Sequence, residues 1–138
     1  SFQNNHPYVI RPHDDLAQCC DKAQADFEIQ KVKKSGDVIG LNLCLSNDFE
    51  GDLIIWQLNT KKSSNQQPSL ESPGYNYPNS ILKTLPKIKI SIHPGDIYFL
   101  NANNIHAVAS SDNNKTGTRT AISNFLAKID RHTIVTWT

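Results

Sequence analysis

The 138-residue chain has no methionine, only three cysteines and no excess of charge of one sign. Its 14 Lys and Arg residues against 13 Asp and Glu residues leave a formal charge of +1, so we expect no basic surface for nucleic acid or anionic lipid. Apolar runs such as residues 53–56 are far shorter than the roughly 20 residues of a transmembrane helix. The composition therefore predicts neither a nucleic-acid partner nor a membrane partner, and it leaves the oligomeric state open.

The cysteines and the first six residues indicate the cellular compartment of the protein. Cys19, Cys20 and Cys44 are odd in number and form no C-x-x-C pair, which favours free thiols in a reducing compartment. Residues 1–6 are polar and lack the basic and apolar pattern of a secretory signal, so we expect a cytoplasmic protein. A translated chain begins with methionine, so Ser1 indicates a processed or trimmed start.

Short apolar segments bounded by Gly, Pro, Asn and Asp predict a mainly β fold in a single domain, residues 1–138. We expect strands at residues 8–11, 27–33, 38–45, 53–58, 88–92, 97–100, 107–110, 119–126 and 133–137. The one helical candidate is residues 16–27. Many short strands separated by turns favour a sandwich or barrel. Residues 60–79 have no periodicity, which predicts a loop or lid insertion at about 60–80.

One predicted strand, residues 38–45, has two unlike faces. The first face is wholly apolar and the second is small and tolerates polar groups: Ile39, Leu41, Leu43 and Leu45 lie on the first, and Val38, Gly40, Asn42 and Cys44 on the second. We expect the second face to line a cavity and the apolar face to pack against other parts of the protein.

The histidines provide a candidate metal site. In an extended chain residues i and i+2 point to the same side, so His13 and Asp15 of the H-x-D triplet are able to reach one ion. His106, where a turn at residues 101–104 gives way to a predicted strand, is the best third ligand. Two imidazoles and one carboxylate with open positions are typical of non-haem Fe(II) oxygenases. Each of these residues taken alone is more often an ordinary surface or structural residue.

The order of several motifs makes the site more specific. They are Pro12-His13-Asp14-Asp15, Gly40-Leu41-Asn42-Leu43-Cys44-Leu45-Ser46, Glu50-Gly51-Asp52-Leu53-Ile54-Ile55-Trp56, Ile92-His93-Pro94-Gly95-Asp96-Ile97-Tyr98-Phe99, His106-Ala107-Val108 and Arg119-Thr120-Ala121-Ile122-Ser123-Asn124-Phe125. This series resembles the core of the Fe(II)/2-oxoglutarate-dependent oxygenases over about residues 8–126. The resemblance implies a double-stranded β-helix, a jelly-roll or cupin-like fold with few helices.

The resemblance also implies roles for individual residues. His13, Asp15 and His106 would bind Fe(II), and Arg119 would pair with the distal carboxylate of 2-oxoglutarate, as a planar guanidinium does well. The family often has a serine two residues after this arginine, where this chain has Ala121. That departure leaves the second carboxylate contact open.

Three further residues complete the predicted site. Ser123, on the same strand face as Arg119, and Asn42 are candidates for a second contact with 2-oxoglutarate. Trp56 is a candidate border of the substrate pocket, although a tryptophan in the core is commoner.

The implied reaction is hydroxylation of a C–H bond with 2-oxoglutarate and dioxygen as co-substrates, releasing succinate and CO2. Asp15 favours hydroxylation over halogenation, because halogenating relatives have Gly or Ala at this position. We expect a small-molecule substrate, an amino-acid derivative or natural product. A protein hydroxylase of the prolyl type and a non-catalytic cupin-like binding module are the alternatives. Since such enzymes usually carry N-terminal supporting elements, we expect the chain to be the core of a longer protein.

Overall fold

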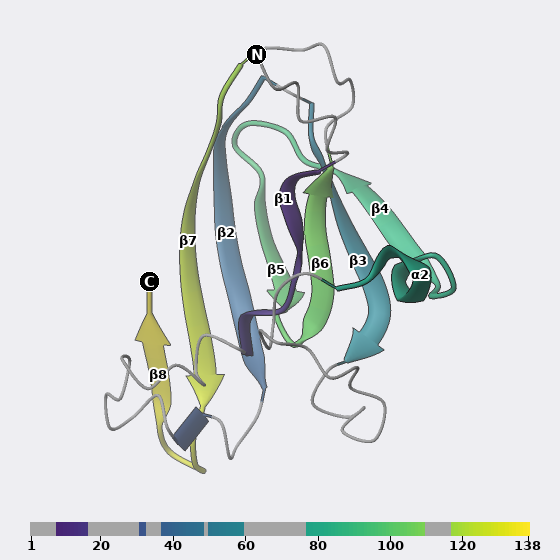
Figure 1. Ribbon diagram of the computed structural model, residues 1–138. Helices are drawn as coiled ribbons and strands as arrows, with labels where there is room; N and C mark the ends of the chain where they lie inside the picture. Colours follow the sequence, from purple (N-terminus) through teal and green to yellow (C-terminus); the bar gives the residue numbers. More distant parts are fainter. Residues whose placement is uncertain (1–7, 17–30, 33–36, 49, 60–76, 110–116) are drawn as a thin grey trace, which may run out of the picture.

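The computed structural model describes residues 8–16, 31–32, 37–48, 50–59, 77–109 and 117–138. They form two antiparallel four-stranded sheets that face each other (Figure 1). Sheet A has the strand order β1-β6-β3-β4, and sheet B has the order β5-β2-β7-β8. The elements are β1 (Tyr8–His13), β2 (Val38–Asn47), β3 (Asp52–Asn59), α2 (Asn79–Leu82), β4 (Lys87–Ser91), β5 (Ile97–Asn101), β6 (Asn104–Ala109), β7 (Arg119–Lys128) and β8 (Ile134–Trp137).

The register of the strands brings distant parts of the chain together. In sheet A, β1 pairs with β6 so that His13 lies opposite His106. In sheet B, β2 runs between β5 and β7, and Asn42 lies opposite both Tyr98 and Ser123. The register therefore places His13 beside His106 in sheet A, and Asn42 beside Ser123 in sheet B.

The turn between β4 and β5 shows how local chemistry sets this register. Gly95 has a φ of +93°, a conformation that glycine adopts without a steric penalty. Its N–H donates to Cys44 O at 2.8 Å, and the N–H of Cys44 donates to Asp96 O at 3.0 Å. The Asp96 carboxylate accepts from the N–H of His93 at 2.7 Å. These bonds fix where β5 begins along β2, and so where Tyr98 lies.

Apolar side chains fill two layers. Between the sheets, Cys44 packs with Leu53 and Ile92. Behind sheet A, a second cluster, here called the rear cluster, joins the sheet to α2; its buried members are Ile54, Trp56, Leu82, Ile105 and Ala107. The indole N–H of Trp56 donates to Leu82 O at 3.1 Å, which ties α2 to β3.

The outer face of sheet B is different, because its large apolar side chains are exposed. They are Ile39 (44% exposed), Leu45 (49%), Ile97 (64%), Phe99 (68%) and Ile122 (57%). The two faces predicted for residues 38–45 exist, and Val38, Gly40 and Cys44 are buried on the inner one. Asn42 lines the cavity, as expected for this face. The apolar face points outward, and the described residues leave its Ile39 and Leu45 exposed, so its packing against other parts of the protein stays a prediction.

Other predicted elements shift or fall outside the described residues. Of the strand expected at 27–33, the described residues Lys31 and Val32 are helical, and the rest lie outside the description, as does most of the helix candidate 16–27. Most of the expected loop at 60–80, residues 60–76, also lies outside it, and α2 follows. His106 lies within β6, which begins earlier than expected because Asn104 pairs with Asn59 of β3. Within the described residues no helix is long and apolar enough to cross a membrane.

Candidate active site

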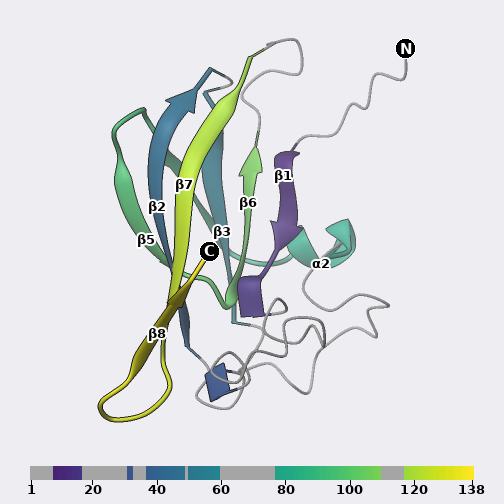
Figure 2. The same ribbon diagram turned by 90° about the vertical axis from the view of Figure 1, so that its left-hand side faces the viewer.

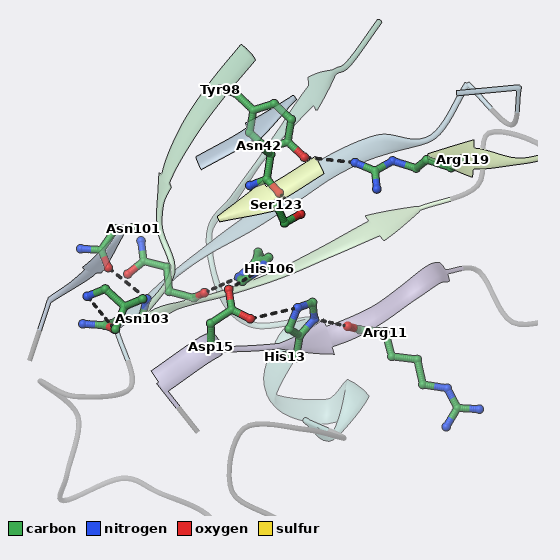
Figure 3. A network of polar contacts seen from close by, with 12 residues as sticks. Arg11, His13, Asp15, Asn42, Tyr98, Asn101, Asn103, His106, Arg119 and Ser123 are labelled. Carbon is green, nitrogen blue, oxygen red and sulfur yellow. Dashed lines mark hydrogen bonds and ion pairs between the residues drawn. The ribbon is translucent and has the colours of Figure 1, made fainter. Parts of the chain in front are cut away.

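The structure brings the three predicted metal ligands together (Figure 3). The imidazole rings of His13 and His106 lie 4.3 Å apart, centre to centre. Asp15 lies between them: its carboxylate oxygens are 3.6 Å from His13 Nε2 and 3.3 Å from His106 Nε2. One nitrogen or oxygen atom from each residue lies within 4.8 Å of the others, which is close enough for all three to bind one ion.

The backbone orients both histidine rings. His13 Nδ1 lies 2.7 Å from Arg11 O, and His106 Nδ1 lies 2.9 Å from Asn104 O. Because a carbonyl oxygen only accepts, the proton of each neutral ring belongs on Nδ1, and the Nε2 lone pair faces Asp15. Histidines that bind metals usually donate their other ring N–H in this way.

The position of Asp15 is also set by the backbone. Its N–H donates to Ala102 O at 2.9 Å, and the N–H of Ala102 donates to Val38 O at 2.8 Å. Asn103, which is fully buried, accepts from the N–H of Val38 at 3.4 Å. Asp15, in the turn that follows β1, is thus attached to the turn that joins β5 to β6, and through it to β2.

Burial and charge act differently on the two histidines. Burial lowers the pKa of His13, and the nearby His106 lowers it further. Burial also lowers the pKa of His106, but the hydrogen bond and charge of Asp15 outweigh this, and the net pKa is raised. A buried carboxylate that attracts positive charge, flanked by imidazole nitrogens, fits a divalent cation, and two histidines with one carboxylate fit Fe(II).

The metal-ligand residues form one wall of a cavity of about 110 Å³. Sheet B supplies polar groups to the opposite wall: Asn42, Tyr98, Arg119 and Ser123. Apolar side chains complete the lining: Ile10, Leu53, Leu100, Val108 and Phe125. Three residues predicted on this side, Asn42, Arg119 and Ser123, therefore face the same space as the predicted metal ligands.

Arg119 is only partly satisfied by the protein. Its Nη2 donates to the hydroxyl of Tyr98 at 3.1 Å, while its Nε is buried and has no hydrogen-bond partner among the described residues. A buried donor without an acceptor costs about 1–3 kcal/mol, and more when it is charged. A carboxylate in the cavity would satisfy Nε, because guanidinium groups bind carboxylates through two parallel hydrogen bonds. Nearby, Ser123 Oγ donates to Asn42 Oδ1 at 2.6 Å.

Two residues differ from the sequence-based expectation. Trp56 does not border this cavity; it is 1% exposed and belongs to the rear cluster, because Leu53 faces the cavity and residue 56 lies on the opposite face of β3. Tyr98 was not singled out, although it contacts Arg119. In the predicted strand 97–100, Tyr98 shares a face with Leu100, because alternate residues of a strand point to the same side. This alternation was the available signal.

Two known proteins are similar to this chain. No protein-family model matches the chain. The L-isoleucine 3(1)-dioxygenase of Pantoea ananatis is 29% identical over 136 residues, which are 98% of this chain and 44% of that protein. A solved structure, an N-substituted L-amino acid dioxygenase from Burkholderia ambifaria, has a TM-score of 0.62 at 16% identity and covers 97% of this chain and 49% of that one.

The chain spans about half the length of both proteins. The similarity in sequence relates it to an amino-acid dioxygenase, and the similarity in structure shows a shared fold. The similarity in sequence confirms the resemblance to a dioxygenase, and the similarity in structure, together with the two facing sheets, confirms the predicted jelly-roll fold.

Proposed function

We propose that the chain is the catalytic core of an Fe(II)/2-oxoglutarate-dependent oxygenase that hydroxylates a C–H bond of an amino acid or amino-acid derivative. One observation carries the proposal: a His-Asp-His cluster and a half-buried arginine, whose buried Nε has no partner among the described residues, face each other across one small cavity. The substrate class comes from the two similar proteins, whose names specify L-isoleucine and N-substituted L-amino acids.

On sheet A, His13, Asp15 and His106 would hold Fe(II). When bound, the iron together with 2-oxoglutarate and dioxygen supplies the oxidant for hydroxylation, and succinate and CO2 are released. The three residues lie on one wall of the cavity, at the end of β1, in the turn after it and on β6, so an ion that they held would be open to co-substrates in the cavity.

On sheet B, Arg119 would bind the distal carboxylate of 2-oxoglutarate, with Tyr98 holding the guanidinium in place. Because Asn42 Oδ1 already accepts from Ser123, the amide N–H groups of Asn42 remain as donors. The cavity of about 110 Å³ is much smaller than the roughly 300–1,000 Å³ of pockets for drug-sized ligands. It therefore suits a small dicarboxylate, which the polar groups of both walls would bind and the apolar side chains between them would pack against.

The test is spectroscopic. Fe(II) and 2-oxoglutarate are added to the protein without oxygen, and we expect a visible charge-transfer band that is lost in His106→Ala. His93→Ala is the matched control, because His93 lies exposed in the β4–β5 turn. The absence of a band in the wild type, or its persistence in His106→Ala, would contradict the proposal.

Turnover identifies the substrate class. Succinate release is measured with a panel of free and N-substituted amino acids and, separately, with proline-containing peptides. Stimulation by the amino acids alone is the expected result. Stimulation by peptides alone would favour a protein hydroxylase, and binding without any turnover would favour a non-catalytic module.

A further inference from the structure

Asp14, between the candidate ligands His13 and Asp15, has a separate partner. It is only 4% exposed and does not line the cavity. Its carboxylate accepts a hydrogen bond from the hydroxyl of Tyr77. The chain leaves β1 after His13 and turns at residues 15–16. Within this turn the Asp14 side chain is held by Tyr77, while His13 and Asp15 line the cavity.

Tyr77 is itself held by the rear cluster. Its ring packs on that cluster, which includes Trp56 and Leu82. The next residue, Pro78, accepts from the N–H of Leu82 at 3.2 Å, and Leu82 accepts from the Trp56 indole. The phenol is therefore placed by α2 and β3 rather than by β1.

The hydroxyl of Tyr77 stays protonated. Burial raises the pKa of Tyr77, and its hydrogen bond to Asp14 and the charge of that residue raise it further, well above the ordinary value. At neutral pH the phenol is thus a permanent donor. Asp14, a second carboxylate beside the metal site, is occupied by this donor and held away from the position of a metal ligand.

We propose that Asp14 and Tyr77 are a positioning pair: their hydrogen bond anchors the H-x-D turn to α2, aims Asp15 at the metal, and keeps Asp14 from replacing it. The inference rests on the proposed function, because it concerns the same metal centre. Residues 13 to 15 are then held at three places, namely the β1–β6 pairing at His13, the phenol at Asp14, and Ala102 O at the N–H of Asp15.

The experiment uses Co(II) in place of iron, because its visible absorption reports coordination geometry. Tyr77→Phe, which keeps the packed ring, and Asp14→Ala, which removes the acceptor, are titrated with Co(II) alongside the wild type. We expect the dissociation constant to rise about tenfold, the size usual for losing a partner that orients a metal ligand, together with a changed spectrum at saturation. The double variant is expected to match the single variants, because both break one interaction.

Thr84→Val is the control, because it also removes a hydroxyl hydrogen bond at the end of α2, to Ile81 O at 2.8 Å, but makes no link to β1. It is expected to leave affinity and spectrum unchanged. Urea unfolding of every variant reports stability separately. Lower stability of Tyr77→Phe with an unchanged Co(II) affinity and spectrum would show a merely structural role and overturn the inference.

Failure of the proposed function would look different. In that case the wild type itself would not bind Co(II), or His106→Ala would bind it equally well. If the wild type binds and His106→Ala does not, the metal centre stands, and the behaviour of Tyr77→Phe alone decides the role of the pair.

Discussion

Sheets A and B face the same cavity but line it with different chemistry. Sheet A presents imidazoles and a carboxylate, which suit a cation, whereas sheet B presents a guanidinium, hydroxyls and an amide, which suit an anion. Their outer faces differ as well. Figure 2 shows α2 beside sheet A, on the side away from β2 and β7, while sheet B exposes Ile97, Phe99 and Ile122. The difference teaches that α2 and the rear cluster cover sheet A behind β3 and β6, although Ile88 of β4 is 58% exposed, whereas the described residues leave the outer face of sheet B largely uncovered.

The largest expected effect tests this difference in packing. Trp56→Ala, behind sheet A, removes a fully buried ring and is expected to lower the free energy of unfolding by about 3–5 kcal/mol. Phe99→Ala, on the outer face of sheet B and 68% exposed, is expected to change it by less than about 0.5 kcal/mol. Urea unfolding measures both, with Trp56→Phe as a milder variant that retains a ring. Equal losses would mean that the outer face of sheet B is covered in solution.

The next prediction tests whether the two sheets have separate roles, with the metal bound on one side of the cavity and 2-oxoglutarate on the other. Arg119→Gln is expected to weaken 2-oxoglutarate binding about tenfold to a hundredfold, because a charge-assisted hydrogen bond contributes about 1.5–3 kcal/mol. Co(II) binding should be unchanged, since Arg119 lies on the opposite wall from the metal-ligand residues. Calorimetry of 2-oxoglutarate with the Co(II)-loaded protein measures the first affinity, and titration of the metal-free protein with Co(II) measures the second. Arg131→Gln, in the exposed β7–β8 turn, is the control. A parallel loss of metal would refute the separation of roles between the sheets.

The smallest expected effect is on the stability in acid. It compares a carboxylate on sheet A with one in the turn between two strands of sheet B. Burial raises the pKa of Asp52 on β3, but its hydrogen bonds to Lys89 and Ser91 outweigh this, and the net pKa is lowered. In the β7–β8 turn, the N–H of His132 and groups of Thr133 lower the pKa of Asp130. Each group therefore binds fewer protons in the folded state, so its contribution is present above the unfolded pKa near 4 and is lost as pH falls through the folded value.

We expect Asp52→Asn to lower stability by about 1 kcal/mol at pH 7, since its bonds to Lys89 and Ser91 are charge-assisted, and Asp130→Asn to lower it less, because Asp130 is exposed. Both differences from the wild type should shrink toward pH 2. Urea unfolding at several pH values measures this. A difference for Asp52→Asn that stays constant down to pH 2 would show that charge is not its cause.

Much of this architecture was predictable from the sequence. Alternation and turn residues predicted most strands within a few residues, and the order of the motifs pointed to His13, Asp15, His106 and Arg119. It was harder to predict which face of a strand points inward. Residues 53–56 are apolar on both faces, so nothing local shows that Leu53 faces the cavity and Trp56 does not.

Contacts between remote residues were beyond a pattern-based reading. Tyr98 meets Arg119 only because the Gly95 turn sets the register of β5 on β2. Asp14 and Tyr77 lie 63 positions apart, and neither belongs to a repeat or a motif that links them. Such pairs depend on the packing of α2 behind sheet A, which arises from the complete fold.

The pairing of β1 with β6 also affects the order of events in folding. His13 and His106 meet only after a loop of most of the chain has closed, and the entropy of that closure is lost before the contacts that compensate for it form. Folds dominated by such distant pairings fold in milliseconds to seconds, not microseconds. We therefore expect the ligand set to form late on the folding pathway. A metal that binds such a late-formed site would slow unfolding and leave the folding rate almost unchanged.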